Sequence, residues 1–116
     1  MTPSELLQRE AHLESRAQAA QTAAAAAYGR LLGLAETRDS GQIRTVVQFL
    51  ASTYNSTAFP YDLYDLRTVD IEISDDMLTC LDALRWAKRD LHGLVDNGAE
   101  RVEAVIADWG LKWPEC

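Results

Sequence analysis

The stretch Ser74–Leu91, SDDMLTCLDALRWAKRDL, decides the predicted fold. Its apolar residues recur at spacings of three and four, which places them on one face of an α-helix. Ser74 is a good N-cap residue, and Asp75 and Asp76 put negative charge at the positive end of the helix dipole. We therefore predict a central helix whose buried stripe is Met77, Cys80, Leu81, Leu84, Ala87 and Leu91.

Upstream of the central helix, the residues from Thr2 to about Arg38 predict one long helix. Thr2-Pro3-Ser4-Glu5 has the form of a capping box with proline at the first helical position. Small and apolar residues then follow a heptad spacing that is interrupted at Glu10. At 1.5 Å per residue this helix is roughly 54 Å long, which is more than the width of a domain of this size. The stripe consists of Leu6, Leu13, Ala17, Ala20, Ala24, Ala27, Leu31 and Leu34.

Residues 1–27 are predicted to form a helical arm, and residues 28–116 the helical domain. Two interpretations of the arm stand side by side. Its small residues allow a second helix to approach closely, which would make it a contact for a second copy or for a partner. Alternatively, it is a solvated helix, maintained by the high helix propensity of alanine, glutamate, glutamine and arginine. The contact residues in the first interpretation are Leu13, Ala17, Ala20 and Ala24.

The remaining segments predict short helices. Residues 42–54 have a period near 3.6, although three β-branched residues also permit a strand. Asp62 begins one helical turn in which Leu63 and Leu66 enter the core, and residues 68–73 are either a short strand or loosely helical. Asn97, with Glu100 three residues on, repeats the capping-box pattern before a last helix. We therefore expect an all-α protein with about four main helices, a long N-terminal helix and one short helical turn. The last helix buries Val102, Val105, Ile106 and Trp109, ends at Gly110, and precedes an apolar tail that folds back on the domain.

The charge balance disfavours one class of partner. The chain has 18 acidic and 11 basic residues, a formal net charge of -7. A protein repelled by phosphate lacks the counterion release that drives nucleic-acid binding, so we expect no direct nucleic-acid contact. The acidity suits a protein partner with a basic surface, but solubility alone also accounts for it.

The cysteines and the hydropathy point to a cytoplasmic protein. Cys80 lies on the apolar stripe and Cys116 is the last residue, so no disulfide framework is expected. We find no pattern of a signal peptide and no run near the roughly 20 apolar residues that a membrane span needs. The chain is therefore expected to be cytoplasmic and without membrane association.

An acidic segment is the main candidate site. It contains six carboxylates within 15 positions, with only Arg67 among them. The spacing is not that of a calcium loop, and several of these residues stand where helix caps and first turns are expected. The segment is therefore either a set of caps and surface charges or an acidic docking face for a partner. The candidate partner-binding residues are Asp62, Asp65, Asp70, Glu72, Asp75 and Asp76.

No arrangement of residues predicts catalysis. Cys80 is on the buried stripe, where cysteine behaves as a small hydrophobe, and His12 and His92 have no metal-ligand spacing. No phosphate-binding loop or nucleophile motif occurs. We therefore predict a non-enzymatic protein without cofactor or metal. A small enzyme or regulator that uses the acidic segment is the least favoured hypothesis.

Several blocks of the chain resemble a known family. They are Leu31-Leu32, Asp39 to Gln42, Val47 with Phe49-Leu50 and Asn55, Asp62 to Leu66, Val69-Asp70, Ile73 to Thr79, and Trp113 to Glu115. From Tyr28 to Glu115 the chain is similar to a family of small uncharacterised proteins of proteobacterial plasmids, prophages and integrative elements. It departs from that family at Thr53-Tyr54, where the family carries an aromatic pair, and in the arm of residues 1–27.

The resemblance implies residence on mobile DNA. Small acidic proteins in that setting are often accessory or counter-defence factors, including anti-CRISPR inhibitors that occupy a surface meant for nucleic acid or for a nuclease. The leading hypothesis is a protein-binding inhibitor or accessory factor that blocks a basic surface of a host defence complex, such as a CRISPR effector. The alternative is a structural homodimer held by the N-terminal heptad stripe.

Overall fold

The structure, a computed structural model, describes residues 1–115. Within that range the chain forms helices and no strand, so the prediction of an all-α fold with four main helices and a long first helix is confirmed. Residues 71–73, for which a strand was one of two expectations, are the first turn of the third helix. The elements are α1 (Pro3–Thr37), α2 (Gly41–Tyr54), the 3₁₀-helix η1 (Leu63–Thr68), α3 (Ile71–Leu84), the 3₁₀-helix η2 (Leu91–Leu94) and α4 (Gly98–Asp108).

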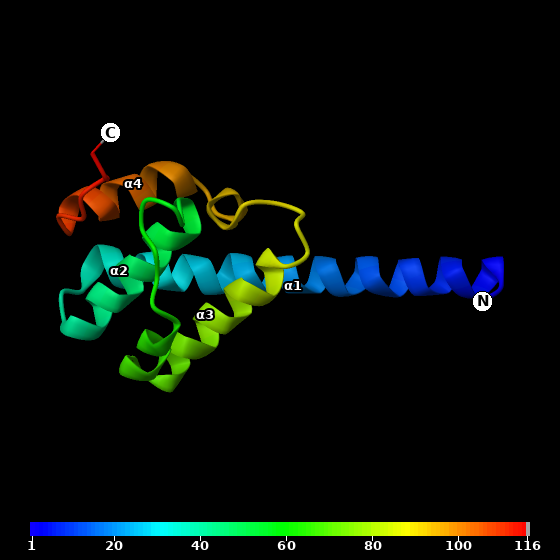
Figure 1. Cartoon of the computed structure of the whole chain (residues 1–116). Helices are drawn as coiled ribbons and strands as arrows, with labels where there is room; N and C mark the ends of the chain where they lie inside the picture. Colours follow the sequence, from blue (N-terminus) through cyan, green and yellow to red (C-terminus); the bar gives the residue numbers. More distant parts are fainter. Residues whose placement is uncertain (116) are drawn as a thin grey trace.

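Helix α1 sets the length of the molecule. It begins as predicted, because the Thr2 hydroxyl oxygen accepts a hydrogen bond from the Glu5 amide at 3.1 Å. Its N-terminal part projects beyond the other elements (Figure 1). The longest dimension is 55 Å and the radius of gyration is 16.1 Å, against about 13 Å for a compact chain of this length. The difference reflects the projecting part of α1.

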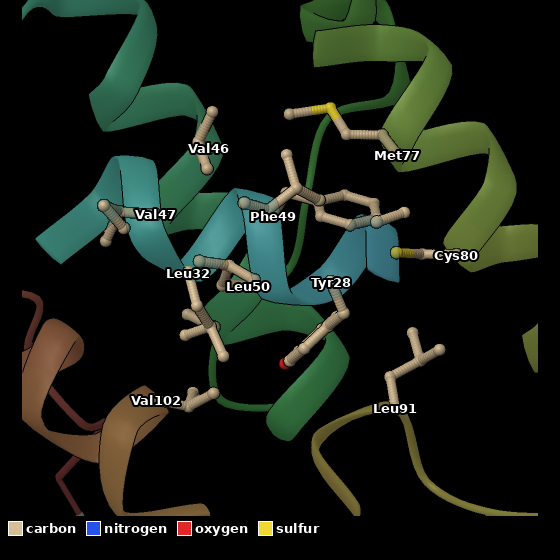
Figure 2. Close-up of a cluster of buried hydrophobic side chains, with 14 of the residues drawn as sticks. Tyr28, Leu32, Val46, Val47, Phe49, Leu50, Met77, Cys80, Leu91 and Val102 are labelled. Atoms are coloured by element: carbon tan, nitrogen blue, oxygen red, sulfur yellow. The ribbon is translucent and has the colours of Figure 1, made fainter. Parts of the chain in front are cut away.

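The hydrophobic core lies where α2, α3, η2 and α4 surround the C-terminal half of α1. Figure 2 shows Tyr28 and Leu32 of α1 facing side chains from the other helices. The Tyr28 hydroxyl lies 2.8 Å from the Thr53 hydroxyl, so its one polar group is satisfied within the core. Burial raises the pKa of Tyr28 to about 12.

Alanines bring α1 and α3 close together. α1 packs more extensively on α3 than on any other element. Ala17, Ala20, Ala24 and Ala27 are all buried, and they lie on one face of α1. Because their side chains are short, they permit close approach of another helix within the same chain. The core therefore reaches into residues 1–27, and the exposed part of α1 ends near residue 16.

The predicted bounds of the central helix, 74–91, are wrong at both ends. α3 begins at Ile71 because the Asp70 carbonyl accepts hydrogen bonds from the Ile73 and Ser74 amides. Ser74 is inside the helix, where its hydroxyl bonds to the Ile71 carbonyl at 2.9 Å. Asp70 rather than Ser74 is therefore the N-cap residue.

The helix ends seven residues before the predicted end. Arg85 is the C-cap residue, and Ala87 has a φ of 55°, a left-handed conformation that turns the chain away from the helix axis. The apolar spacing continues to Leu91, but that residue is buried from η2 rather than from α3. Met77 and Cys80 are fully buried as predicted, whereas Leu84 is 48% exposed and does not belong to the core.

Two short-range predictions were also wrong. Leu63 was expected to enter the core, but it is 67% exposed, and of the two leucines only Leu66 packs partly against the core. Asn97 precedes α4 in a left-handed conformation and makes no capping hydrogen bond with its side chain. At the next residue, Gly98, a Cβ atom would lie 1.7 Å from the His92 carbonyl oxygen, so the close packing of α4 on η2 requires glycine there.

The C-terminal tail folds back, as predicted. Gly110, with a φ of 71°, ends α4, and the Trp109 indole donates a hydrogen bond to the Ala35 carbonyl at 3.1 Å. The Trp113 ring packs edge-on against Phe59, with the ring centres 4.7 Å apart. The tail thus joins α4 to α1 and to the loop after α2.

Candidate protein-binding surface

The six predicted acidic residues do not form a single face. Asp62 precedes η1 and Asp65 lies within it, whereas the other four lie at the start of α3. In α3 they separate again. Glu72 and Asp76 line a depression between α1 and the N-terminal ends of α2 and α3, and Asp75 lines a second one next to Trp86.

Three of the six carboxylates are used within the fold. The Asp62 carboxylate caps η1 by accepting a hydrogen bond from the Tyr64 amide at 2.9 Å, as predicted. Asp70 pairs with Gln42 twice: its amide donates to Gln42 Oε1 at 2.9 Å, and its carboxylate accepts from Gln42 Nε2 at 3.2 Å. Asp76 accepts both hydrogen bonds of a bidentate pair from Arg30, at 2.8 and 3.0 Å. Asp70 thus joins the start of α3 to α2 and Asp76 joins α3 to α1, whereas Asp62 stabilises η1 locally.

The other three carboxylates remain without a cationic partner. Among residues 1–115, the side chains of Asp65, Glu72 and Asp75 take part in no ion pair and no hydrogen bond. Glu72 and Asp75 are exposed, and Asp65 is half-buried. A partner could therefore bind these three carboxylates without breaking an ion pair or a hydrogen bond of the domain.

The predicted arm contacts lie mostly inside the molecule. Ala17, Ala20 and Ala24 are buried, and Leu13 is half-buried. Glutamate at Ala20 or Ala24 would place a charge between α1 and α3, so such changes would destabilise the domain itself. The exposed large apolar side chains of α1 are those of Leu6 and Leu7, at 46% and 67% exposed.

A clamp fixes the point where α1 leaves the domain. Two guanidinium groups lie over the Trp86 ring: that of Arg16 is 5.2 Å from the ring centre, and that of Arg85 is 5.0 Å from it. Lys88 binds Glu14 at 2.9 Å. These contacts all come from the residues that follow α3, which the sequence had placed inside a helix.

An apolar groove is the feature that the sequence did not indicate. It has a volume of about 340 Å³ and lies between α2, residues 56–61, η1 and α3. Phe49 and Tyr61, which are in edge-on contact with ring centres 5.5 Å apart, contribute aromatic surface to it. Leu63 and Leu84, both expected in the core, line it and are exposed instead. Each leucine occupies an apolar position of its own helical segment, and that pattern predicted burial. The pattern does not show whether another segment covers the apolar face, so it could not distinguish a core position from a groove.

Acid–base or nucleophilic chemistry finds little support in the side chains. Burial raises the pKa of the Cys80 thiol to about 12, which disfavours the reactive thiolate. His92 packs against Tyr54, whose hydroxyl bonds to Glu103, and His12 is exposed on α1. In residues 1–115 no three His, Cys, Asp or Glu side chains converge as metal ligands would. None of the helices in residues 1–115 combines the length and the apolar character that crossing a membrane needs.

The fold and the surface define a small helical domain with outward carboxylates and one exposed apolar groove. Residues 25–110 match the model of a family of unknown function, DUF7673, and the chain belongs to that family. The match begins within α1, so most of the projecting helix precedes it. No curated protein and no solved structure matches the chain.

Proposed function

We propose that this protein is a non-enzymatic binding factor that acts by occupying a basic surface of a protein partner. The observation that supports the proposal is the outward charge of Asp65, Glu72 and Asp75, which no cation of residues 1–115 neutralises. Complementary charge speeds encounter and suppresses wrong partners. The net charge of -7 acts in the same direction over the whole molecule.

The family resemblance suggests the setting of this activity. A basic surface that normally holds nucleic acid would be blocked by a carboxylate-bearing protein. An anti-CRISPR protein or another accessory factor of a mobile element would act in this way on a host defence complex. The partner proposed here is therefore a nucleic-acid-binding protein rather than the nucleic acid itself.

Charge reversal tests the proposal. The tagged chain is used to capture partners from a bacterial lysate, and the double variant Asp65→Lys/Glu72→Lys is compared with the unaltered chain. We expect several-fold less of the specific partner with the variant, and weaker capture as salt rises, since charges more than about 8 Å apart are screened at physiological ionic strength. Glu72 is in the first turn of α3, so its reversal also costs about 0.3–1 kcal/mol through the helix dipole.

A matched control separates local from overall charge. Asp96→Lys/Asp108→Lys makes the same change in net charge at exposed positions before and at the end of α4. We expect this variant to capture the partner normally. Equal loss in both variants would mean that net charge alone matters, and equal retention in both would contradict the proposed surface.

A second candidate function, a homodimer, is favoured by one observation. Leu6 and Leu7 are exposed, and they lie in the part of α1 that projects from the domain. Pairing with a second copy would cover both leucines. Light scattering tests this candidate: a dimer mass that Leu6→Ser/Leu7→Ser converts to a monomer mass supports it, and a monomer mass for the unaltered chain contradicts it.

A further inference from the structure

The apolar groove between α2 and α3 has the composition of a site for an apolar side chain. All its lining residues are uncharged, and seven of them are apolar or aromatic: Phe49, Pro60, Tyr61, Leu63, Leu66, Leu81 and Leu84. Its volume, about 340 Å³, is at the lower end of the range for ligand pockets.

The polar atoms on the α2 side of the groove are already satisfied. The Ser52 hydroxyl donates to the Phe49 carbonyl at 2.6 Å, and the Thr53 hydroxyl donates to the Leu50 carbonyl at 2.7 Å. Both hydroxyl protons are therefore already used in hydrogen bonds within α2. The α2 side of the groove thus favours an apolar occupant over a polar one.

The carboxylates beside the groove decide which partner fits. Asp62 directly precedes Leu63 and Asp65 directly precedes Leu66, and both leucines line the groove, so the two carboxylates stand at its edge on η1. Burial raises the pKa of Tyr61 to about 12, and the negative charges of Asp65 and Asp62 add to the increase. The Asp65 side chain has no partner in residues 1–115, and Asp62 uses only one of its oxygens as a cap. Arg67, the basic side chain of η1, stacks over the Tyr64 ring with its charge 5.1 Å from the ring centre.

We propose that the groove is an anchor site for a partner segment in which lysine or arginine flanks one large apolar side chain, with that side chain in the groove and the cations beside Asp62 and Asp65. This inference rests on the proposed function and specifies its site. Interfaces concentrate their energy in a few buried apolar or aromatic anchors, while surrounding polar groups exclude water. The exposed leucines Leu63 and Leu84 would be covered by such a segment.

Three synthetic peptides of equal length test the proposal with the full chain. One carries a tryptophan between lysines, the second has glycine in place of the tryptophan, and the third has glutamates in place of the lysines. We expect only the first to bind in fluorescence anisotropy, with affinity falling several-fold from low to physiological salt. In methyl NMR spectra it should shift the resonances of Leu63, Leu66, Leu81 and Leu84.

Two leucines of α3 provide a matched pair of variants. Leu84 lines the groove and is 48% exposed, whereas Leu78 is 52% exposed and lines the depression next to Trp86. Leu84→Ser should weaken binding of the first peptide several-fold, and Leu78→Ser should leave it unchanged. Melting temperatures of both variants check that the fold is kept.

Several results would overturn this inference. They are binding of the glycine peptide as tightly as the tryptophan peptide, shifts confined to other methyl groups, equal effects of the two serine variants, or no binding by any peptide. Each leaves the charge-reversal result of the proposed function standing. Loss of peptide discrimination with retained charge-dependent capture would therefore reject the groove alone.

Discussion

At the scale of single residues, Ala87 has the least ordinary conformation in α3 and its connections. Its φ of 55° lies in the left-handed region, where a side chain costs about 1–2 kcal/mol and where helices commonly place glycine. The residues on either side of it contact α1: the Trp86 ring lies against Arg16, and Lys88 pairs with Glu14.

We predict that Ala87→Gly stabilises the protein. The glycine removes the steric cost of the left-handed conformation, and the added freedom of the unfolded chain offsets part of that gain. The expected increase in the free energy of unfolding is about 0.5–1 kcal/mol, measured by urea denaturation. Ala104→Gly, at an exposed position inside α4, is the control and should instead lose about 1 kcal/mol. A loss of stability from Ala87→Gly would show that this turn is not strained.

At the scale of elements, α1 has two unequal parts. Up to residue 16 every residue except the half-buried Leu13 is exposed, and from Ala17 onward one face of the helix is buried in the domain, including Ala17, Ala20, Ala24 and Ala27. The division follows from the clamp after α3, which reaches Glu14 and Arg16 and goes no further along the helix.

Two truncations should therefore differ strongly. A chain beginning at residue 13 loses only exposed helix, so we expect its free energy of unfolding to change by less than about 1 kcal/mol. A chain beginning at residue 25, where the family match starts, loses the buried Ala17, Ala20 and Ala24. It leaves one side of α3 uncovered and should be destabilised by several kcal/mol, at about 25 cal/mol per Å² of apolar surface exposed. Equal stability of the two chains in urea denaturation would contradict the packing of α1 on α3.

At the scale of the whole molecule, the buried Tyr28 and Cys80 and the half-buried Tyr61 make stability sensitive to alkaline pH. Burial raises the pKa of Tyr28, of Tyr61 and of Cys80 to about 12 in each case. Each group is neutral in the folded protein and ionises first in the unfolded chain. The unfolded state therefore binds fewer protons between the two pKa values, and stability falls as pH rises through that interval.

We predict that the protein is fully stabilised by these groups below about pH 9 and loses that stability progressively up to about pH 12. For Tyr28, the increase from 10.0 to about 12 corresponds to roughly 2–3 kcal/mol at 1.36 kcal/mol per unit. Tyr28→Phe should weaken the pH dependence between 10 and 12, although it also removes the hydrogen bond to Thr53 and so costs about 1 kcal/mol at neutral pH. Melting temperatures measured across this range check the slope. An unchanged slope in the variant would mean that Tyr28 ionises as readily in the folded state.

Local signals in the sequence determined the helices and several of their ends. Periodicity indicated α1, α2, the buried part of α3 and α4, and the caps at Thr2 and Asp62 appear where hydroxyl and carboxylate side chains follow known capping patterns. These features depend on residues within a few positions of one another, so they can be read from the order of the chain.

Tertiary packing alone decided the rest. The end of α3 depends on contacts of Trp86 and Lys88 with α1, and Gly98 is required by the close packing of α4 on η2. The acidic segment was visible in the sequence, but its division into paired and free carboxylates depends on Arg30 and Gln42 from α1 and α2. The groove exists because α2 and α3 leave Leu63 and Leu84 without a covering helix. Periodicity identifies an apolar face, but whether that face is covered depends on where distant segments of the chain come to lie.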